Sequence, residues 1–210
     1  MKLPVAKEVM PYFIPTLIVT IGVGILNPIA GYIGVVLCIY LLYFFRNPTR
    51  SLPEGKNLIV SPADGKIVGI DVVEPREYFT EKMWRISIFL NIFNVHINYA
   101  PITATIAGIT YKKGSFLPAN AERSSIQNEN NMVILRNTGN QLIGVRQIAG
   151  MIARRIVCDC SDGDTVMQGD RIGLIKFSSR VEIFLPLTAK IVVTNGDRVK
   201  GKTTILGLMK

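Results

Sequence analysis

The fold is decided by a stretch near the C-terminus, Gly-Leu-Ile-Lys-Phe-Ser-Ser-Arg-Val-Glu-Ile-Phe-Leu-Pro, which covers residues 173–186. Two short apolar runs, Leu174–Phe177 and Val181–Leu185, have the length and side-chain content of β-strands. Between them lie three polar residues, 178 to 180, which cannot all be buried without cost. Such an interruption is typical of a turn or a bulge at a sheet edge. The stretch therefore predicts two strands separated by a polar segment.

Short strands are predicted through the rest of residues 58–210. Turn residues separate the apolar runs at close intervals, so this part of the chain is expected to be mainly β. The predicted strands are Leu58–Val60, Lys66–Val73, Trp84–Leu90, Val95–Asn98, Ala104–Tyr111, Met132–Arg136, Gln141–Ala149 and Arg155–Cys158.

Two stretches, residues 61–70 and 163–175, resemble the halves of lipoyl and biotinyl domains. Both carry Asp-Gly or Gly-Asp turns beside alternating Val and Ile residues. This resemblance implies a barrel-sandwich-hybrid-like β domain within a mainly β (α+β) protein. About ninety residues separate the two stretches, far more than a carrier domain needs. We expect this insertion to house the chemistry.

The N-terminal part contains two apolar runs, Tyr12–Leu26 and Ile29–Phe45, separated by Asn-Pro. Each run would span roughly 22 to 26 Å as a helix, against ~30 Å for a hydrocarbon core. The pattern predicts a helical membrane hairpin over residues 1–46. A single tilted span, with the other run lying in the membrane interface, is the alternative. A cleaved signal peptide is disfavoured because no small-x-small site follows the first run.

Basic residues flank the apolar runs on both sides. Lys2 and Lys7 precede the first run, and Arg46 and Arg50 follow the second. The positive-inside tendency then places both ends of the hairpin in the cytoplasm. We therefore expect a cell-membrane protein whose second domain lies on the cytoplasmic side.

Composition supports a membrane element followed by a separate domain. Hydrophobic residues make up 49% of the 210 residues, and the net charge is +9. Such a charge indicates an anionic partner, and the apolar runs favour a lipid surface over nucleic acid. A linker over residues 47–57, rich in Pro, Gly and charge, separates the hairpin from the domain at 58–210.

Cysteine and histidine are scarce. The three cysteines are an odd number without framework spacing, so we expect reduced thiols. One histidine beside Cys158 and Cys160 supplies too few ligands for a zinc site, and no metal is expected.

Two motifs carry residues that are typical of acid and base chemistry. Asp64 lies in Ser-Pro-Ala-Asp-Gly, where the default interpretation is a turn. His96 lies in Phe-Asn-Val-His-Ile-Asn-Tyr-Ala-Pro, where the default is a hydrogen-bonded core residue. His96 is the single histidine of the sequence. Imidazole chemistry near neutral pH must therefore use this residue.

Three motifs occur in the same order as in the short-form phosphatidylserine decarboxylases. They are Pro-Ala-Asp-Gly, Phe-Asn-Val-His-x-Asn-x-x-Pro and Phe-Ser-Ser-Arg-Val-Glu-Ile-Phe-Leu-Pro. The chain thus resembles this pyruvoyl-dependent family, which includes bacterial phosphatidylserine and archaeal archaetidylserine decarboxylases. The resemblance implies a catalytic triad of Asp64, His96 and Ser179. It also implies self-cleavage between residues 178 and 179, giving chains 1–178 and 179–210.

The resemblance also implies a mechanism. Asp64 orients His96, His96 activates Ser179, and the Ser179 hydroxyl attacks the preceding carbonyl. Ser179 becomes a pyruvoyl group, which forms a Schiff base with the amine of a serine phospholipid. Release of CO₂ then gives the ethanolamine phospholipid, with no metal.

The chain departs from the family pattern at Ser178, where the family has glycine. Glycine tolerates a strained backbone and exposes its carbonyl, so a side chain here could slow the attack. One alternative is therefore an unprocessed, inactive precursor that binds lipid. The other alternative, from a different class, is a non-catalytic membrane adaptor with a hybrid β-domain.

Residues 145–156 also match a family segment, and they include basic side chains. Arg146, Gln147, Arg154 and Arg155 are candidate substrate-binding residues because guanidinium groups match phosphate oxygens and stay charged. The default interpretation of each arginine is a solvated strand face. The motifs concern only the head group of the lipid, so they are compatible with both acyl and isoprenoid tails. They are also compatible with a homodimer.

Overall fold

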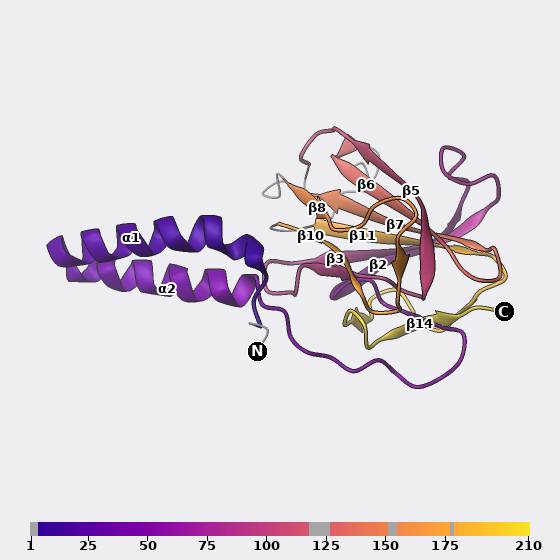
Figure 1. Cartoon of the computed structure of the whole chain (residues 1–210), viewed down its shortest axis with the longest axis horizontal. Helices are drawn as coiled ribbons and strands as arrows, with labels where there is room; N and C mark the ends of the chain where they lie inside the picture. Colours follow the sequence, from indigo (N-terminus) through magenta and orange to yellow (C-terminus); the bar gives the residue numbers. More distant parts are fainter. Residues whose placement is uncertain (1–3, 118–126, 151–154, 177–178) are drawn as a thin grey trace. The chain divides into compact units, whose positions relative to one another are not determined.

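The computed structural model describes residues 4–117, 127–150, 155–176 and 179–210. The chain divides into two compact units, Met1–Thr49 and Arg50–Lys210. Figure 1 shows a helical pair in the first unit and strands in the second. Residues 50–57 thus belong to the unit that contains the strands.

The first unit is a helical hairpin. A short 3-10 helix, Lys7–Val9, leads into α1 (Met10–Leu26), and α2 follows at Pro28–Phe44. The Asn27 side chain caps the N-terminus of α2, because its Oδ1 accepts hydrogen bonds from the N–H groups of Ile29 and Ala30. Residues 7–26 form a helix long and apolar enough to cross a membrane, and α2 is shorter. These features support membrane association.

The second unit is built on an eight-stranded antiparallel sheet that curls around one core. Its strand order is β13-β2-β3-β11-β7-β6-β5-β9. The strands are β2 (Gly65–Val73), β3 (Met83–Leu90), β5 (Ala104–Lys112), β6 (Asn130–Arg136), β7 (Leu142–Ala149), β9 (Thr165–Val166), β11 (Ser179–Pro186) and β13 (Arg198–Val199).

Two three-stranded sheets complete this unit. The first has the order β1-β14-β12 and the second β4-β10-β8. Their strands are β1 (Leu58–Val60), β14 (Ile205–Leu208), β12 (Lys190–Ile191), β4 (Ile97–Tyr99), β10 (Arg171–Ile175) and β8 (Ile156–Cys158).

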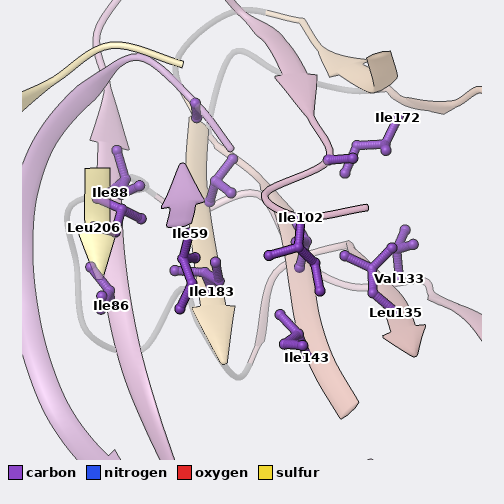
Figure 2. Close-up of a cluster of buried hydrophobic side chains, with 14 of the residues drawn as sticks. Ile59, Ile86, Ile88, Ile102, Val133, Leu135, Ile143, Ile172, Ile183 and Leu206 are labelled. Atoms are coloured by element: carbon purple, nitrogen blue, oxygen red, sulfur yellow. The ribbon is translucent and has the colours of Figure 1, made fainter. Parts of the chain in front are cut away.

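Strand β11 occupies the middle of the large sheet. It pairs with β3 along its whole length and with β7 over six residues. Successive side chains alternate between faces, so Val181, Ile183 and Leu185 enter the main core. Figure 2 shows Ile183 in this core beside Ile86 of β3. On the opposite face, Phe184 belongs to a smaller apolar cluster.

The mainly β fold with an N-terminal helical hairpin is confirmed. One detail of the prediction is wrong: Ser179 and Arg180 are not part of a polar interruption, since both lie in strand β11 and are buried. Neighbouring strands on both sides satisfy their backbone groups, and Glu182 lies 3.5 Å from Arg180 Nε. Ser178 lies outside the described residues.

The two stretches that resemble lipoyl-domain halves both contribute to the eight-stranded sheet, through β2 and β9, but the second also enters another sheet. Residues 65–73 belong to the eight-stranded sheet, and residues 171–175 belong to the sheet of β4, β10 and β8. The two-residue strands β9, β12 and β13 are too short to show a periodicity, and neither they nor β14 are predicted from the sequence.

Candidate active site

Ser179 is the first residue of the central strand β11. Its Cα lies opposite Leu90 of β3 and Ala149 of β7. Its side chain shares the core-facing side with Val181, and it is fully buried. Among the described residues, Ser179 Oγ has no hydrogen-bond partner. Because an unsatisfied buried hydroxyl costs about 1–3 kcal/mol, a functional reason for this serine is expected.

The backbone opposite Ser179 is braced by Asn128. The Asn128 side chain donates to the carbonyl oxygens of Ala149 (2.7 Å) and Leu117 (2.8 Å). Its Oδ1 accepts the Leu117 N–H at 2.9 Å. The Ala149 N–H donates to the Glu129 carbonyl oxygen at 2.9 Å. This segment therefore fixes the strand end against which Ser179 lies.

A chain of buried amides runs beneath the same face of the sheet. Asn131 donates to Gln147 Oε1 at 3.0 Å, and Gln147 Nε2 donates to Asn98 Oδ1 at 2.8 Å. A Cβ at residue 173 would overlap the Val157 carbonyl oxygen and lie 2.8 Å from Gln147 Nε2, so glycine makes room for both. The Asn98 Nδ2 is buried and has no partner among the described residues. Within the described residues, the network thus leaves the amide N–H groups of Asn98 without an acceptor, on the side of the sheet that carries Ser179.

His96 lies just before β4 and is almost completely buried. Its Nδ1 lies 2.9 Å from the Asn94 carbonyl oxygen. A carbonyl oxygen can only accept, so Nδ1 carries the proton and Nε2 of the neutral ring is the basic atom. The His96 carbonyl oxygen accepts the Ile175 N–H at 3.2 Å, which joins this segment to β10 four residues before Ser179.

Asp64 lies in the turn before β2. Its Oδ1 accepts hydrogen bonds from Arg50 Nη1 (2.5 Å) and the Gly201 N–H (2.8 Å), and its Oδ2 accepts from Arg50 Nη2 (2.8 Å). The next residue, Gly65, has φ +155°, and a Cβ there would overlap the Phe89 carbonyl oxygen. The second residue of the predicted Asp-Gly turn, Gly65, therefore has to be glycine.

Two members of the predicted triad, His96 and Asp64, form their hydrogen bonds with different residues. The His96 ring is oriented by the Asn94 carbonyl, whereas the Asp64 carboxylate is held by Arg50 and Gly201. The catalytic linkage of Asp64, His96 and Ser179 stays a prediction. All three are buried residues of the second unit.

The candidate substrate-binding residues are divided between the two faces of β7. Gln147 lies on the face of Ser179, within the amide chain. Arg146 lies on the opposite face, where Nε and Nη2 both contact Glu182 Oε2 and the guanidinium lies 5.2 Å from the Phe184 ring centroid. Arg155 is exposed just before β8. Arg154 lies outside the described residues.

Four residues of this region were not assigned a role from the sequence. They are Arg50, Asn98, Asn128 and Glu182. Asn98 lies in the motif that contains His96, and its position two residues from His96 is a usable signal. The sequence indicates Arg50 only as a membrane-topology signal, because its sequence neighbours give no hint of Asp64.

Thiols and metal ligands offer little chemistry among the described residues. No group of three His, Cys, Asp or Glu side chains gathers there in a metal-binding arrangement. Cys158 and Cys160 are free, and burial raises the pKa of Cys160 to about 11. This thiol therefore stays protonated near neutral pH.

Fold and site together define a mainly β protein with a helical hairpin and a buried serine as its candidate nucleophile. Residues 37–207 match the model of the phosphatidylserine decarboxylase family. A phosphatidylserine decarboxylase proenzyme of Syntrophus aciditrophicus is 46% identical over 169 residues, which cover 80% of this chain and 79% of that protein.

Two further relatives match nearly the whole chain. Proenzymes of the same name from Ralstonia nicotianae and Desulfotalea psychrophila are 41% and 37% identical. The matches cover 96% and 98% of this chain, and 94% and 97% of those proteins. The chain therefore belongs to the phosphatidylserine decarboxylase family, a family of carboxy-lyases. The resemblance carried by the three motifs is confirmed.

Proposed function

We propose that the chain is the precursor of a pyruvoyl-dependent decarboxylase that acts on a serine phospholipid, phosphatidylserine or archaetidylserine. The precursor cleaves itself between residues 178 and 179 into chains 1–178 and 179–210. The mature enzyme releases CO₂ and leaves the ethanolamine phospholipid. One observation carries this proposal: Ser179 is completely buried at the start of the central strand, with no hydrogen-bond partner for Oγ among the described residues.

Self-cleavage begins at the Ser179 hydroxyl. A base, assigned here to His96 Nε2, accepts the hydroxyl proton while Oγ attacks the carbonyl carbon of residue 178. The C–N bond breaks, the Ser179 nitrogen takes up the proton, and an ester joins the two residues. Loss of the Ser179 Cα proton then expels the carboxylate of residue 178 and leaves dehydroalanine. Addition of water and departure of ammonia give the pyruvoyl group.

The unsatisfied Ser179 hydroxyl and the surplus Asn98 donor fit a site that becomes polar and reactive after processing. The pyruvoyl group supplies an electrophilic carbonyl that binds an amine and accepts the electron pair left by CO₂. The chain's own residues bind and orient the substrate and exclude water. His96, as the single imidazole of the sequence, is the candidate to return a proton to the substrate carbon.

The two products of cleavage are expected to stay together. The small chain would contain β11, β12, β13 and β14, and β11 lies between β3 and β7 of the large chain. Separating the chains would break every hydrogen bond of a central strand and expose core side chains such as Ile183.

Substrate capture is assigned to basic and amide groups near the site. Gln147 supports this role through its place on the face of Ser179, and Arg155 through its exposure. Arg146 and Arg154 are retained as phosphate-binding candidates, although Arg146 already pairs with Glu182. The apolar hairpin would hold the enzyme at the cell membrane, where its substrate is, with the second unit on the cytoplasmic side.

Intact mass under denaturing conditions tests the proposal. The full chain should change, slowly or incompletely, from one 23.2 kDa species into two fragments that break before Ser179. The small fragment should be blocked to Edman sequencing because its amine has become a ketone. Ser179→Ala should stay intact, whereas Ser87→Ala, at a buried serine of the adjacent strand, should cleave like the parent. Cleavage of Ser179→Ala would refute the assigned nucleophile.

A further inference from the structure

Arg50 is the basic residue at which the second unit begins, and its side chain is largely buried. Only 13% of that side chain is exposed. Its two terminal nitrogens contact the two carboxylate oxygens of Asp64 at 2.5 and 2.8 Å. Its Nη1 also donates to the Gly201 carbonyl oxygen at 2.9 Å. We call this group of Arg50, Asp64 and Gly201 the arginine clamp.

The clamp joins three segments that are far apart in the sequence. Arg50 belongs to the segment that follows the helical hairpin, Asp64 precedes β2, and Gly201 follows β13. The Gly201 backbone contributes both its groups: its N–H donates to Asp64, and its carbonyl accepts from Arg50. Each member therefore contacts the other two.

The clamp uses three acceptor positions of the Asp64 carboxylate. A carboxylate oxygen accepts about two hydrogen bonds. Oδ1 already accepts two, from Arg50 and Gly201, whereas Oδ2 accepts one from Arg50. Because the guanidinium fork is planar and bidentate, it also sets the plane of the carboxylate. Among the described residues, one acceptor position on Oδ2 is thus left in a fixed direction.

The surroundings of the clamp keep the Arg50 guanidinium charged. Tyr99 contacts the same region, and burial raises its pKa to about 12, so it adds no negative charge at neutral pH. The hydrogen bond to Asp64 raises the pKa of Arg50, which keeps the guanidinium charged. A lysine here could not donate to both oxygens in one plane.

We propose that Arg50 is a positioning residue for self-cleavage, which fixes the Asp64 carboxylate and ties it to residue 201 of the future small chain. The proposal rests on the proposed function, because it assumes that Asp64 acts in processing. It makes the segment after the helical hairpin part of the reacting unit. It also gives Arg50 a role apart from membrane topology.

The test uses the full chain, as written and with Ser178→Gly, and follows the loss of the uncleaved species with time. Arg50→Ala should slow cleavage at least tenfold. Arg50→Lys should fall between Ala and the parent because it restores the charge but not the fork. Added guanidinium ion should recover part of the rate of Arg50→Ala, which a purely structural loss would not allow. Arg76→Ala, at an exposed arginine that also pairs with a carboxylate, should cleave like the parent.

Hydrogen exchange supplies a readout that does not depend on cleavage. In a Ser179→Ala background, Arg50→Ala should increase amide exchange in the peptide that contains Gly201, since the acceptor Asp64 is no longer fixed. Increased exchange with unchanged cleavage would overturn the positioning role, and unchanged exchange would overturn the clamp. If Arg50→Ala fails to fold, Arg50→Lys decides by the same two measurements. A parent that never cleaves, even with Ser178→Gly, would contradict the proposed function while the exchange result still judges the clamp.

Discussion

Two buried arginine–carboxylate pairs of the second unit differ in how they are built. Arg146 and Glu182 are direct cross-strand neighbours on β7 and β11, on the face opposite to Ser179. Arg50 and Asp64 are not strand partners, and they meet with the Gly201 backbone in a turn region. The first pair follows from strand register, whereas the second needs three separate segments to meet.

The difference indicates different roles. The Glu182 side chain is fully buried, and its surroundings include Arg180 and Ser87 besides Arg146. All four come from three adjacent strands, so we expect this group to stabilise one face of the sheet. The arginine clamp holds a carboxylate that the family resemblance assigns to catalysis. Removing the first carboxylate should therefore affect folding, and removing the second should affect processing.

The largest effect is expected at Asp64. Asp64→Ala and His96→Ala, each in the Ser178→Gly background, should abolish self-cleavage, because the hydroxyl would lose its base or the base its charged partner. Gel electrophoresis that follows the 23.2 kDa band measures this. Glu182→Gln, which keeps the side-chain volume, should still cleave. Normal cleavage of Asp64→Ala would reverse the comparison and make both pairs structural.

The next effect concerns stability at Glu182. Glu182→Ala leaves Arg146, whose side chain is 14% exposed, without its buried partner, and this should cost about 3–5 kcal/mol. Denaturant unfolding of the uncleaved Ser179→Ala chain can be followed through Trp84, which lies opposite Leu185 of β11. Glu74→Ala, at a surface ion pair, should change the midpoint little. A small change at Glu182 would show that the group does not stabilise the sheet.

Much of the fold could be predicted from local pattern. The alternation of Val181, Ile183 and Leu185 predicts one buried strand face, and these residues do enter the main core. The Asn27 break predicts the hairpin turn, and the side chain caps α2. These features depend on residues close together in the sequence, so propensity and periodicity are enough.

Contacts within the candidate site depend on distant residues and could not be predicted in this way. Gln147 and Asn98 are 49 residues apart, and Arg50 and Gly201 are 151 apart. Their meeting depends on the register of several strands, which local patterns do not fix. Likewise the burial of Ser179 follows from the two strands beside β11 and is not evident from its polar neighbours.

The arginine clamp should also differ from the Arg146–Glu182 pair in how the free energy of unfolding depends on pH, because a buried tyrosine lies near it. Tyr99 lies near Arg50 and Asp64, and burial raises its pKa to about 12 from 10.0. A folded-state pKa above the unfolded one means that the folded chain holds the proton more tightly. The contribution of Tyr99 to the free energy of unfolding is therefore fully present below pH 10. It is lost as the pH rises towards 12, which lowers the free energy of unfolding by about 2–3 kcal/mol.

Tyr99→Phe removes this titration. Unfolding of the uncleaved chain at pH 9, 10 and 11 should show a shallower loss for the variant than for the parent. Tyr78→Phe, at the half-buried tyrosine near Arg146, is the matched comparison. Equal slopes for parent and Tyr99→Phe would mean that the clamp region is open to solvent.

We expect the residue at position 178 to determine how fast the chain cleaves itself, and therefore how well variants of the two arginine–carboxylate pairs can be compared by their cleavage rates. We expect attack by Ser179 to need a backbone distortion at residue 178, which glycine would adopt at little cost and which a Cβ would penalise by about 1–3 kcal/mol. Each 1.36 kcal/mol that falls on the barrier slows the step tenfold, so Ser178→Gly should speed cleavage by up to about 150-fold. Ser178→Ala should stay slow, because it keeps the Cβ and removes only the hydroxyl. Cleavage time courses of the parent and the two variants measure this. Rapid, complete cleavage of the parent would refute the steric argument, and the clamp variants could then be compared without the glycine background.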